Sequence, residues 1–289
     1  DDMTKLGRIK AIWRYPVKGM AGESLGTAHL DARGVQGDRL WAVQDIQRQE
    51  IQSCKFRPAL LRCRARCIGD EADSGLGAVE VQFPGGEVLA GDDPGIHQRI
   101  SALLGHESAL QSLRPIEDEA FYRRYKADAH TWLKELKATF EREAGEPLPD
   151  LDNLPQSMQD YVTLPGTFFL VSPFHILTTA SLAHMQAIHP QSDWDIERFR
   201  PNLVIETLPG MEGLVEQAWL GRRLRIGSAQ VECSDTAPRC GAVTRQQSAI
   251  GEDKGILRRI VKDADQNLGI YADIVTAGEI SVGDEVFMA

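Results

Sequence analysis

Apolar and polar residues alternate along much of this chain, and a period of two predicts β-strands. In residues 8–19, RIKAIWRYPVKG, every second residue from Ile9 to Tyr15 is apolar, so these side chains should share one face of a strand. Pro16 cannot donate a hydrogen bond to a neighbouring strand, so the strand should end there. Residues 17–19 are then expected in a loop.

The rest of the N-terminal third predicts more short strands and one helix. Residues 78–91 have the pattern of a hairpin, in which apolar residues alternate up to the turn Pro84-Gly85-Gly86. Residues 92–106 place apolar side chains at helical spacing, with Asp93 as the cap and Gly105 as the stop. Two further strands are predicted at 37–45 and 60–69.

The composition changes between about residues 106 and 165. Charges of both signs surround Trp132, Leu136 and Phe140 at helical spacings, and several prolines follow. This pattern predicts a helical excursion and a loop between two lobes. The segment is either a lid or a solvated amphipathic helix with no part in chemistry.

The remaining residues predict a second lobe rich in strands. Thr179 is the expected cap of a helix at 180–188, and Asp253 of a helix at 254–264. A short helix near 193–200 should lead into the next strand. This lobe should begin at 167–177, and strands are expected at 203–206, 222–233 (a hairpin folded at Gly227-Ser228), 269–278 and 279–288. Many short strands and few long helices favour a β-rich α/β protein built on a β-barrel over a doubly wound sheet.

The composition narrows the possible partners. The 289 residues suffice for two packed subdomains. A formal charge of −10, from 42 acidic and 32 basic residues, argues against nucleic acid as the main partner. Apolar runs are far shorter than a membrane span, no secretory signal precedes the first strand, and the cysteines form no disulfide pattern. We therefore expect a cytoplasmic protein with neither a nucleic-acid nor a membrane partner.

Five cysteines raise the question of a metal or redox site. Zinc needs about four convergent Cys or His ligands, and no such spacing is present. Cys240 is the better candidate, because the neighbouring Arg239 favours the thiolate, which binds soft metals or attacks electrophiles. A dithiol pair with Cys233 and a buried inert thiol both stay open. The cysteines expected as small core residues are Cys54, Cys63 and Cys67.

Basic and amide side chains at loop positions could together bind an anion. Arg200 and Asn202 lie where a loop enters a strand, and arginine suits phosphate because its planar fork is always charged. Lys18 leaves the first strand after a proline, and Lys55 lies in the polar stretch QSCKFRP. Each cation alone is typical of a solvated surface, but the set could neutralise a phosphorylated molecule. No nucleotide-binding glycine motif offers another explanation.

Several stretches, in this order, resemble the MOSC superfamily, whose domain is named after the C-terminus of the molybdenum cofactor sulfurase. The resemblance is to two-part proteins such as the YcbX-type bacterial proteins and the mitochondrial amidoxime-reducing components. It implies an N-terminal MOSC β-barrel domain at 1–105, a helical insert at 106–165 and a MOSC domain at 166–289. The matching stretches are IWRYPVKGMAGESL, GVQGDRLWAV, SPFHILTTASL, RFRPNLVIE, LRIGSAQVE, PRC, NLGIYADIV and GEISVGDEV.

The resemblance also implies a molybdenum cofactor (molybdenum bound to molybdopterin) and a role for each matching position. Cys240 would be the catalytic residue and the thiolate ligand of the metal. Lys55 stands where amidoxime reducers carry arginine, and the two are not equivalent at a bidentate site. The cofactor would be held by Lys18, Lys55, Thr178, Thr179, Arg200, Asn202 and Arg239.

Other positions depart from the amidoxime reducers. Gly19 replaces a serine after YPVK, and Leu170 or Val171 replaces an acidic residue before SPF. Ala237 replaces the first cysteine of their CSRC motif, and residues 242–251 replace their TTVDPDTG. The position of the metal ligand is kept, whereas positions around the substrate differ.

The resemblance implies a molybdenum-dependent oxidoreductase that reduces an N-hydroxylated or N-oxide small molecule. No flavin, haem or iron–sulfur motif is present, so electrons would come from external redox partner proteins, and nothing implies pyridoxal phosphate. An alternative is a sulfur carrier or sulfurtransferase that acts through a Cys240 persulfide or thio-adduct. A third is a non-enzymatic module that stores or delivers the cofactor.

Overall fold

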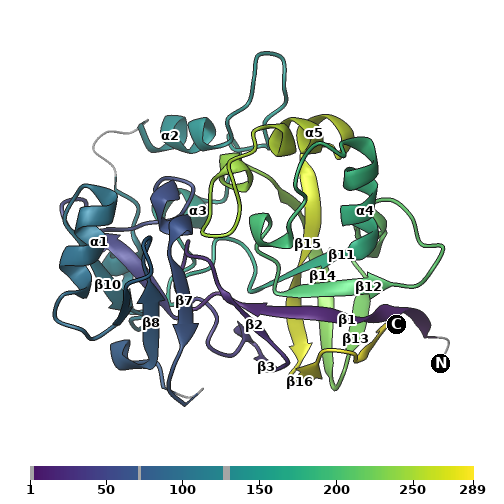
Figure 1. Cartoon of the computed structure of the whole chain (residues 1–289), viewed down its shortest axis with the longest axis horizontal. Coiled ribbons are helices and arrows are strands. Elements are labelled where there is room, and N and C mark those ends of the chain that lie inside the picture. Colours follow the sequence, from purple (N-terminus) through teal and green to yellow (C-terminus); the bar gives the residue numbers. More distant parts are fainter. Residues whose placement is uncertain (1–2, 71–72, 126–130) are drawn as a thin grey trace.

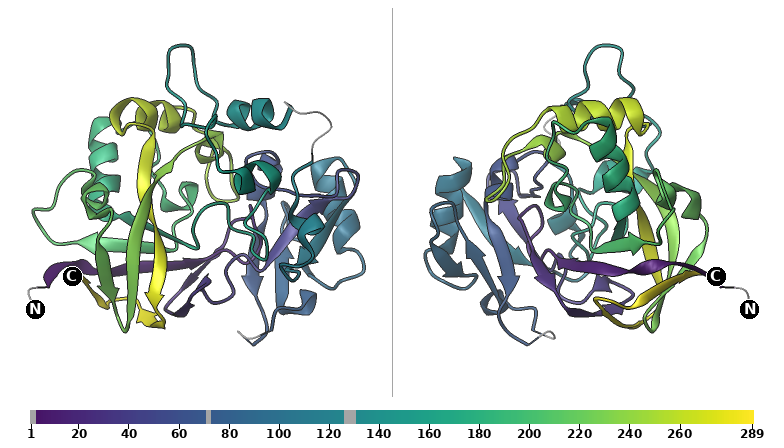
Figure 2. Two further views of the ribbon diagram at one scale, coloured as in Figure 1. Left: turned by 180° about the vertical axis from the view of Figure 1, so that it is seen from behind. Right: turned by 45° about the vertical axis from the view of Figure 1, so that its right-hand side comes forward.

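Two lobes lie side by side in the computed structural model, which describes residues 3–70, 73–125 and 131–289 (Figure 1). The larger lobe contains most of the C-terminal half of the chain together with the first strand. The smaller lobe contains most of the remaining N-terminal third. The teal segment that follows the smaller lobe crosses above both (Figure 2).

A closed β-barrel of seven strands forms the larger lobe. The order β12-β11-β15-β14-β13-β17-β1 returns from β1 to β12, so the first strand closes the barrel, and only β11 and β12 pair in parallel. Alternating apolar residues of all seven strands fill its interior. The strands are β1 (Thr4–Arg14), β11 (Phe174–Thr178), β12 (Leu203–Thr207), β13 (Arg223–Ile226), β14 (Ala229–Pro238), β15 (Asn267–Thr276) and β17 (Glu285–Met288). This confirms a β-rich α/β fold built on a barrel.

A bulge changes the inward face that the sequence predicts for β1. The pairing with β12 skips Lys10, between Ile9 and Ala11. An extra residue reverses the side of every residue beyond it, so Ile12 joins Ile9 in the core and Ala11 does not. The predicted single face from Ile9 to Tyr15 is therefore wrong in its second half.

The smaller lobe packs two three-stranded sheets and α1 (Ile96–Leu104) around its own core. The predicted hairpin and helix are confirmed, and Gly105 ends α1 in the left-handed conformation. The strand predicted at 60–69 is half wrong, because a 3-10 turn, η1 (Pro58–Arg62), precedes it. The sheet strands are β5 (Trp41–Asp45), β6 (Glu50–Ile51) and β10 (Ser108–Ser112), then β7 (Arg64–Cys67), β8 (Val79–Gln82) and β9 (Val88–Ala90).

Further short strands pack against the barrel, and their apolar residues join its core. A third small sheet joins a strand near the end of the chain to two strands near its start. The predicted strand at 279–288 is thereby split between this sheet and β17. These strands are β2 (Glu23–Leu25), which pairs with β1, and β3 (Thr27–Asp31), β4 (Gly34–Val35) and β16 (Gly278–Ser281).

Two helices cover one end of the barrel: α4 (Thr179–Ile188) and α5 (Gly255–Asp263) (Figure 1). Thr178 caps α4 by accepting a hydrogen bond from the backbone of Ser181, so the predicted cap is displaced by one residue. At α5 the residue before the helix is Lys254, so the predicted cap Asp253 is also displaced by one residue, although its side chain accepts from the backbone of Gly255. The short helix predicted near 193–200 is only a 3-10 turn, η4 (Ile196–Arg198).

The segment from 106 to 165 is less helical than its composition predicts. Its first residues form β10, which pairs with β5, and two short helices follow, α2 (Thr131–Thr139) and α3 (Gln156–Asp160). Residues 126–130 of the predicted helix lie outside the described part of the chain. Among the described residues, the helices are all too short or too polar to span a bilayer.

Candidate functional site

A cavity of about 400 Å³ lies between the two lobes and is the candidate site. Loops of the smaller lobe supply one wall, and the ends of β12 and β14 supply another. Residues 136–172 of the crossing segment complete it. The volume falls within the range of about 300–1,000 Å³ that small-molecule sites occupy. Of the predicted site residues, it gathers Lys18, Lys55, Arg200, Asn202, Arg239 and Cys240.

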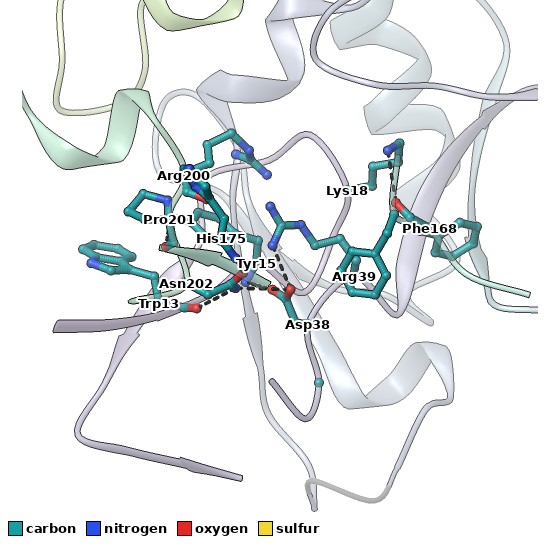
Figure 3. Close-up of polar contacts among 12 residues, drawn as sticks. Trp13, Tyr15, Lys18, Asp38, Arg39, Phe168, His175, Arg200, Pro201 and Asn202 are labelled. Carbon is teal, nitrogen blue, oxygen red and sulfur yellow. Dashed lines mark hydrogen bonds and ion pairs between the residues drawn. The ribbon is translucent and has the colours of Figure 1, made fainter. Parts of the chain in front are cut away.

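Two arginines stack on one buried tyrosine at the base of this cavity. The guanidinium carbons of Arg39 and Arg200 each lie 4.5 Å from the ring centre of Tyr15. Arg39 and Arg200 have φ angles of 49° and 55°, a left-handed conformation that costs about 1–2 kcal/mol. In Figure 3 both guanidinium groups extend into the middle of the view. Backbone strain of this kind is typical of residues in functional sites.

Asp38 balances only part of this positive charge. Its carboxylate accepts hydrogen bonds from Arg39 Nη1 at 2.7 Å, the backbone of Tyr15 at 2.7 Å and the side chain of Asn202 at 3.3 Å. Arg200 donates to the backbone oxygen of Met20 at 2.6 Å and has no carboxylate partner among the described residues. Burial lowers the pKa of Arg200, and the nearby charge of Arg39 adds to this. An anion in the cavity would relieve both costs.

Lys18 is a buried ammonium group with few partners. The loop after β1 holds it through its backbone amide, which donates to Trp41, and the side chain is only 6% exposed. Its Nζ donates to the backbone oxygen of Phe168 at 3.1 Å (Figure 3). An ammonium group carries three donors, and among the residues that the structure describes only this one hydrogen bond is made. Burial lowers the pKa of Lys18 from 10.5 to about 7.

Arg239 and His175 form a buried pair beside Cys240. Arg239 donates to the backbone oxygens of Leu268 and Phe199, and its Nη2 lies 2.8 Å from His175 Nε2. A guanidinium only donates, so this ring nitrogen must accept and the proton is on Nδ1. Nδ1 then faces the backbone oxygen of Arg200 at 3.4 Å. Burial, with the charge of Arg239, holds the pKa of His175 well below 6.5. The neutral ring thus links two of the site's arginines.

Asn202 joins strands and loops at the cavity wall. Its amide nitrogen donates to Trp13 at 3.1 Å, and its oxygen accepts from the backbone of His175 at 3.1 Å. Together with the bond to Asp38, these contacts use both ends of the carboxamide. Asn202 and Arg239 are therefore placed to position neighbouring groups rather than to present free donors.

Thr178 and Thr179 do not line the cavity. The hydroxyl of Thr178 donates to Glu216 at 2.6 Å and caps α4, while that of Thr179 lies 3.3 Å from the hydroxyl of Thr207. Glu216 is fully buried, and burial raises its pKa. The two predicted hydroxyls thus have structural partners at the end of β11.

Cys240 lies where β14 ends and the turn η6 (Gly241–Thr244) begins, and it is 6% exposed. Its sulfur belongs to a cluster with Phe140 and Leu151 of the crossing segment. Cys233, by contrast, faces the core of the barrel. Burial raises the pKa of its thiol to about 12, so Cys233 is not a partner thiol in the cavity.

The loop of Cys54 and Lys55 also lines the cavity. Cys54 is half-buried and lines the cavity, so its prediction as a core residue is wrong. Cys63 is in the core as expected, and Cys67 packs against it. The Lys55 ammonium lies 5.2 Å from the ring centre of Phe140. Gly19, at φ 83°, permits this loop to approach, because a Cβ there would lie 2.9 Å from Cys54 N.

The fixed charge of the cavity is strongly positive. Among the described residues of the lining, Asp150 is the acidic one, and the basic ones include Lys18, Arg39, Lys55, Arg200 and Arg239. Sequence reasoning missed Arg39 and His175. Arg39 lies inside a stretch that the alternating pattern assigns to a strand, and His175 carries no motif of its own. Only packing across the lobes reveals their position.

Comparisons with known proteins bear on most of the chain. Residues 6–122 match the family model of the MOSC N-terminal beta barrel domain, and residues 164–287 match that of the MOSC domain. Mitochondrial amidoxime reducing component 2 of Bos taurus is 24% identical over an alignment of 326 positions, gaps included, that covers 99% of this chain and 84% of the bovine protein. The two family models leave out residues 123–163, which carry α2 and α3.

The solved structures that resemble this chain have lower sequence identity to it. The YUAD protein from Bacillus subtilis is 10% identical, with 99% of this chain and 98% of that chain covered and a TM-score of 0.43. YiiM from Geobacillus stearothermophilus is 15% identical, with 41% and 54% covered and a TM-score of 0.31.

Proposed function

We propose that this chain, which belongs to the MOSC superfamily, is an oxidoreductase that holds a molybdenum–pterin cofactor through Cys240. The observation that supports this most is the position of Cys240 in a cavity whose fixed charge is strongly positive. Thiolate is a soft ligand and suits a metal such as molybdenum. Arginine and lysine are the usual partners of phosphate. One cavity thus offers both donor types that the cofactor needs.

The residues present fit such an anion. The Lys18 ammonium makes one bond, to Phe168, and Arg200 has no carboxylate partner among the described residues. Buried cations of this kind are costly unless a negative group reaches them. We propose that Lys18, Arg39, Lys55 and Arg200 would face the cofactor's phosphate and pterin. Arg239, Asn202 and His175 would position those groups.

The proposed substrate is an N-hydroxylated or N-oxide small molecule. The bovine relative is named an amidoxime reducing component, which supports this class. When bound, the cofactor supplies two-electron oxygen-atom transfer. For an N-hydroxyl group the reaction takes up two electrons and two protons, breaks the N–O bond and releases water. External redox proteins would supply the electrons, and the chain's residues bind, orient and shield the reactants.

A sulfur carrier that uses a Cys240 persulfide is less well supported. That alternative would be favoured by a second thiol beside Cys240. Cys233 was the candidate for this thiol, but it faces the barrel core. Reduction of an N-hydroxylated or N-oxide molecule is therefore the better supported function.

Reduction of a simple amidoxime tests the proposal. Cofactor-loaded protein, with reduced methyl viologen as the electron source, should form the amidine. Cys240→Ser should lower the rate by at least about 100-fold, because the metal loses its protein ligand. Cys67→Ser, a cysteine in the smaller lobe, is the matched control and should keep its rate. Equal rates for Cys240→Ser and wild type would overturn the proposal.

A further inference from the structure

One side of the cavity is an apolar roof, defined here as residues 136–171 of the crossing segment. The same cavity is lined by Lys18, Lys55 and Arg200. Two of these cations touch the roof, since Lys18 donates to Phe168 and the Lys55 ammonium lies 5.2 Å from the ring centre of Phe140. Asp150 is its charged residue on the lining, among the residues that the structure describes. The apolar side chains of the roof that line the cavity include Leu136, Phe140, Leu151, Leu154, Met158 and Val162. The cavity thus combines basic groups with an apolar surface.

The roof touches Cys240 directly. Phe140 and Leu151 form one buried cluster with Cys240 and are 3% and 9% exposed. Ala242, two residues after Cys240, packs against the same cluster. A molecule whose reacting group lies beside this sulfur must therefore place its remaining atoms against Phe140 and Leu151.

Polar contacts on the outer side fix the roof in place. Arg142 donates to the backbone oxygen of Arg239 and to the side chain of Gln266, both at 3.0 Å. Glu141 pairs with Arg245, and Arg258 pairs with Glu146. These bonds satisfy the charged groups of the loop away from the cavity. Most of the side chains that this segment contributes to the cavity are apolar, beside the polar residues Asp150, Ser157, Tyr161 and Thr163.

The crossing segment also packs closely on the residue after Cys240. A Cβ at Gly241 would meet the carboxylate end of the Glu141 side chain, which can move aside. The segment thus lies against both Cys240 and Gly241.

Burial of hydrocarbon and burial of charge have opposite consequences at this wall. Each buried methylene stabilises a complex by about 0.8 kcal/mol, which is three- to fourfold in affinity. A charged or strongly hydrophilic group would lose its water against the apolar side chains of Phe140 and Leu151, which offer it no hydrogen bond.

We propose that the roof makes the Cys240 site selective for substrates that carry an uncharged alkyl or aryl group next to the reacting N–O group. This rests on the proposed reduction of N-hydroxylated molecules. Phe140 and Leu151 are the specificity-determining residues, because they are the buried roof residues of the cluster that contains Cys240.

Two parallel series test the proposal on cofactor-loaded protein. Amidoximes R–C(=NOH)NH2 measure turnover, and the amides R–C(=O)NH2, which have no N–O bond to break, measure binding by calorimetry. In both, R is methyl, propyl or pentyl. Affinity for the amides and kcat/KM for the amidoximes should rise about threefold per methylene. A flat series, or no amide binding at all, would overturn the proposal.

Variants locate the selectivity. Phe140→Ala and, separately, Leu151→Ala should lower the ratio of pentyl to methyl affinity by about 5- to 10-fold, since part of the apolar wall is gone. Phe140→Leu, which keeps a large apolar side chain, should retain most of the ratio. Leu148→Ala, at an exposed position of the same segment, should leave it unchanged. An unchanged ratio in both alanine variants contradicts the assignment.

The two series also separate this proposal from the proposed function. If no amidoxime is reduced but the amides bind with the predicted dependence on chain length, the roof proposal stands and the reductase proposal fails. If amidoximes are reduced at rates independent of R and the amide series is flat, the reverse holds.

Discussion

Replacement of Lys18 by methionine should stabilise the cofactor-free protein near neutral pH and weaken its hold on the cofactor. The ammonium group is buried with one hydrogen bond, and burial lowers its pKa from 10.5 to about 7. At about 1.4 kcal/mol per pH unit, that displacement corresponds to about 5 kcal/mol. Methionine avoids this cost but loses the bond to Phe168, which is worth about 1 kcal/mol. Relaxation around the charge reduces the remainder, so we expect a net gain of about 2–4 kcal/mol below pH 7.

The pH dependence identifies the cause. Between pH 7 and 10.5 the unfolded chain binds the Lys18 proton and the folded chain does not, so the free energy of unfolding of the wild type rises with pH. Below pH 7 both states bind it and the deficit is complete. The advantage of Lys18→Met should therefore be largest at about pH 6.5 and shrink to about 1 kcal/mol or less at about pH 10.

Urea denaturation of the cofactor-free protein at these pH values measures the change in stability that Lys18→Met causes. Lys10→Met, at an exposed position of β1, is the control and should change stability by less than about 0.5 kcal/mol. Cofactor content after purification measures the hold on the cofactor. This content should fall about 10-fold or more, because the charged hydrogen-bond donor is gone. A variant that is less stable than wild type at pH 6.5, or that keeps its full cofactor content, would refute the reasoning.

Three further predictions follow from the same contacts. Thr178→Val removes a helix cap and a bond to Glu216, so urea denaturation should show a loss of about 2 kcal/mol while cofactor content per folded molecule is kept; a loss of cofactor would place Thr178 in the site after all. Because the folded pKa of His175 is well below 6.5, the wild type should lose stability as pH falls below 6.5, and His175→Gln should lose up to about 1.4 kcal/mol less per pH unit; parallel pH profiles would contradict this. Arg142→Ala frees the roof at Arg239 and Gln266, so alkylation of Cys240 by iodoacetamide in the cofactor-free protein should speed up about 10-fold or more, whereas Arg259→Ala, which removes a surface pair with Asp263, should not change it.

The barrel strands could be predicted from the sequence because their inner faces alternate and their turns carry glycine. Closure of the barrel could not, because the pairing of β1 with β12 joins residues about two hundred positions apart and no local pattern records it. The strand β10 was missed because its residues, SALQS, are weakly apolar and lie at the start of a charged segment. The cap of α4 was displaced by one residue because two threonines stand next to each other.

The candidate site divides in the same way. Lys18 and Cys240 follow a strand end or a proline, and Arg200 precedes a proline and a strand, so their loop positions could be read from the sequence. The residues that they contact come from elsewhere in the chain. Tyr15 brings Arg39 to Arg200, and Phe140 reaches Cys240 from a segment whose part in the site the sequence left open between a lid and a solvated helix. Contacts across lobes are tertiary, and residue spacing does not encode them.

Cofactor content tests the central claim most directly. The wild type and Cys240→Ser would be expressed in a host that makes the molybdenum cofactor, and molybdenum and molybdopterin would be measured by mass spectrometry. The account predicts about one equivalent of each in the wild type and less than about a tenth of an equivalent of molybdenum in Cys240→Ser, because the thiolate is the metal's ligand from the protein. A wild type without molybdenum, or a Cys240→Ser protein that holds as much as the wild type, would contradict it.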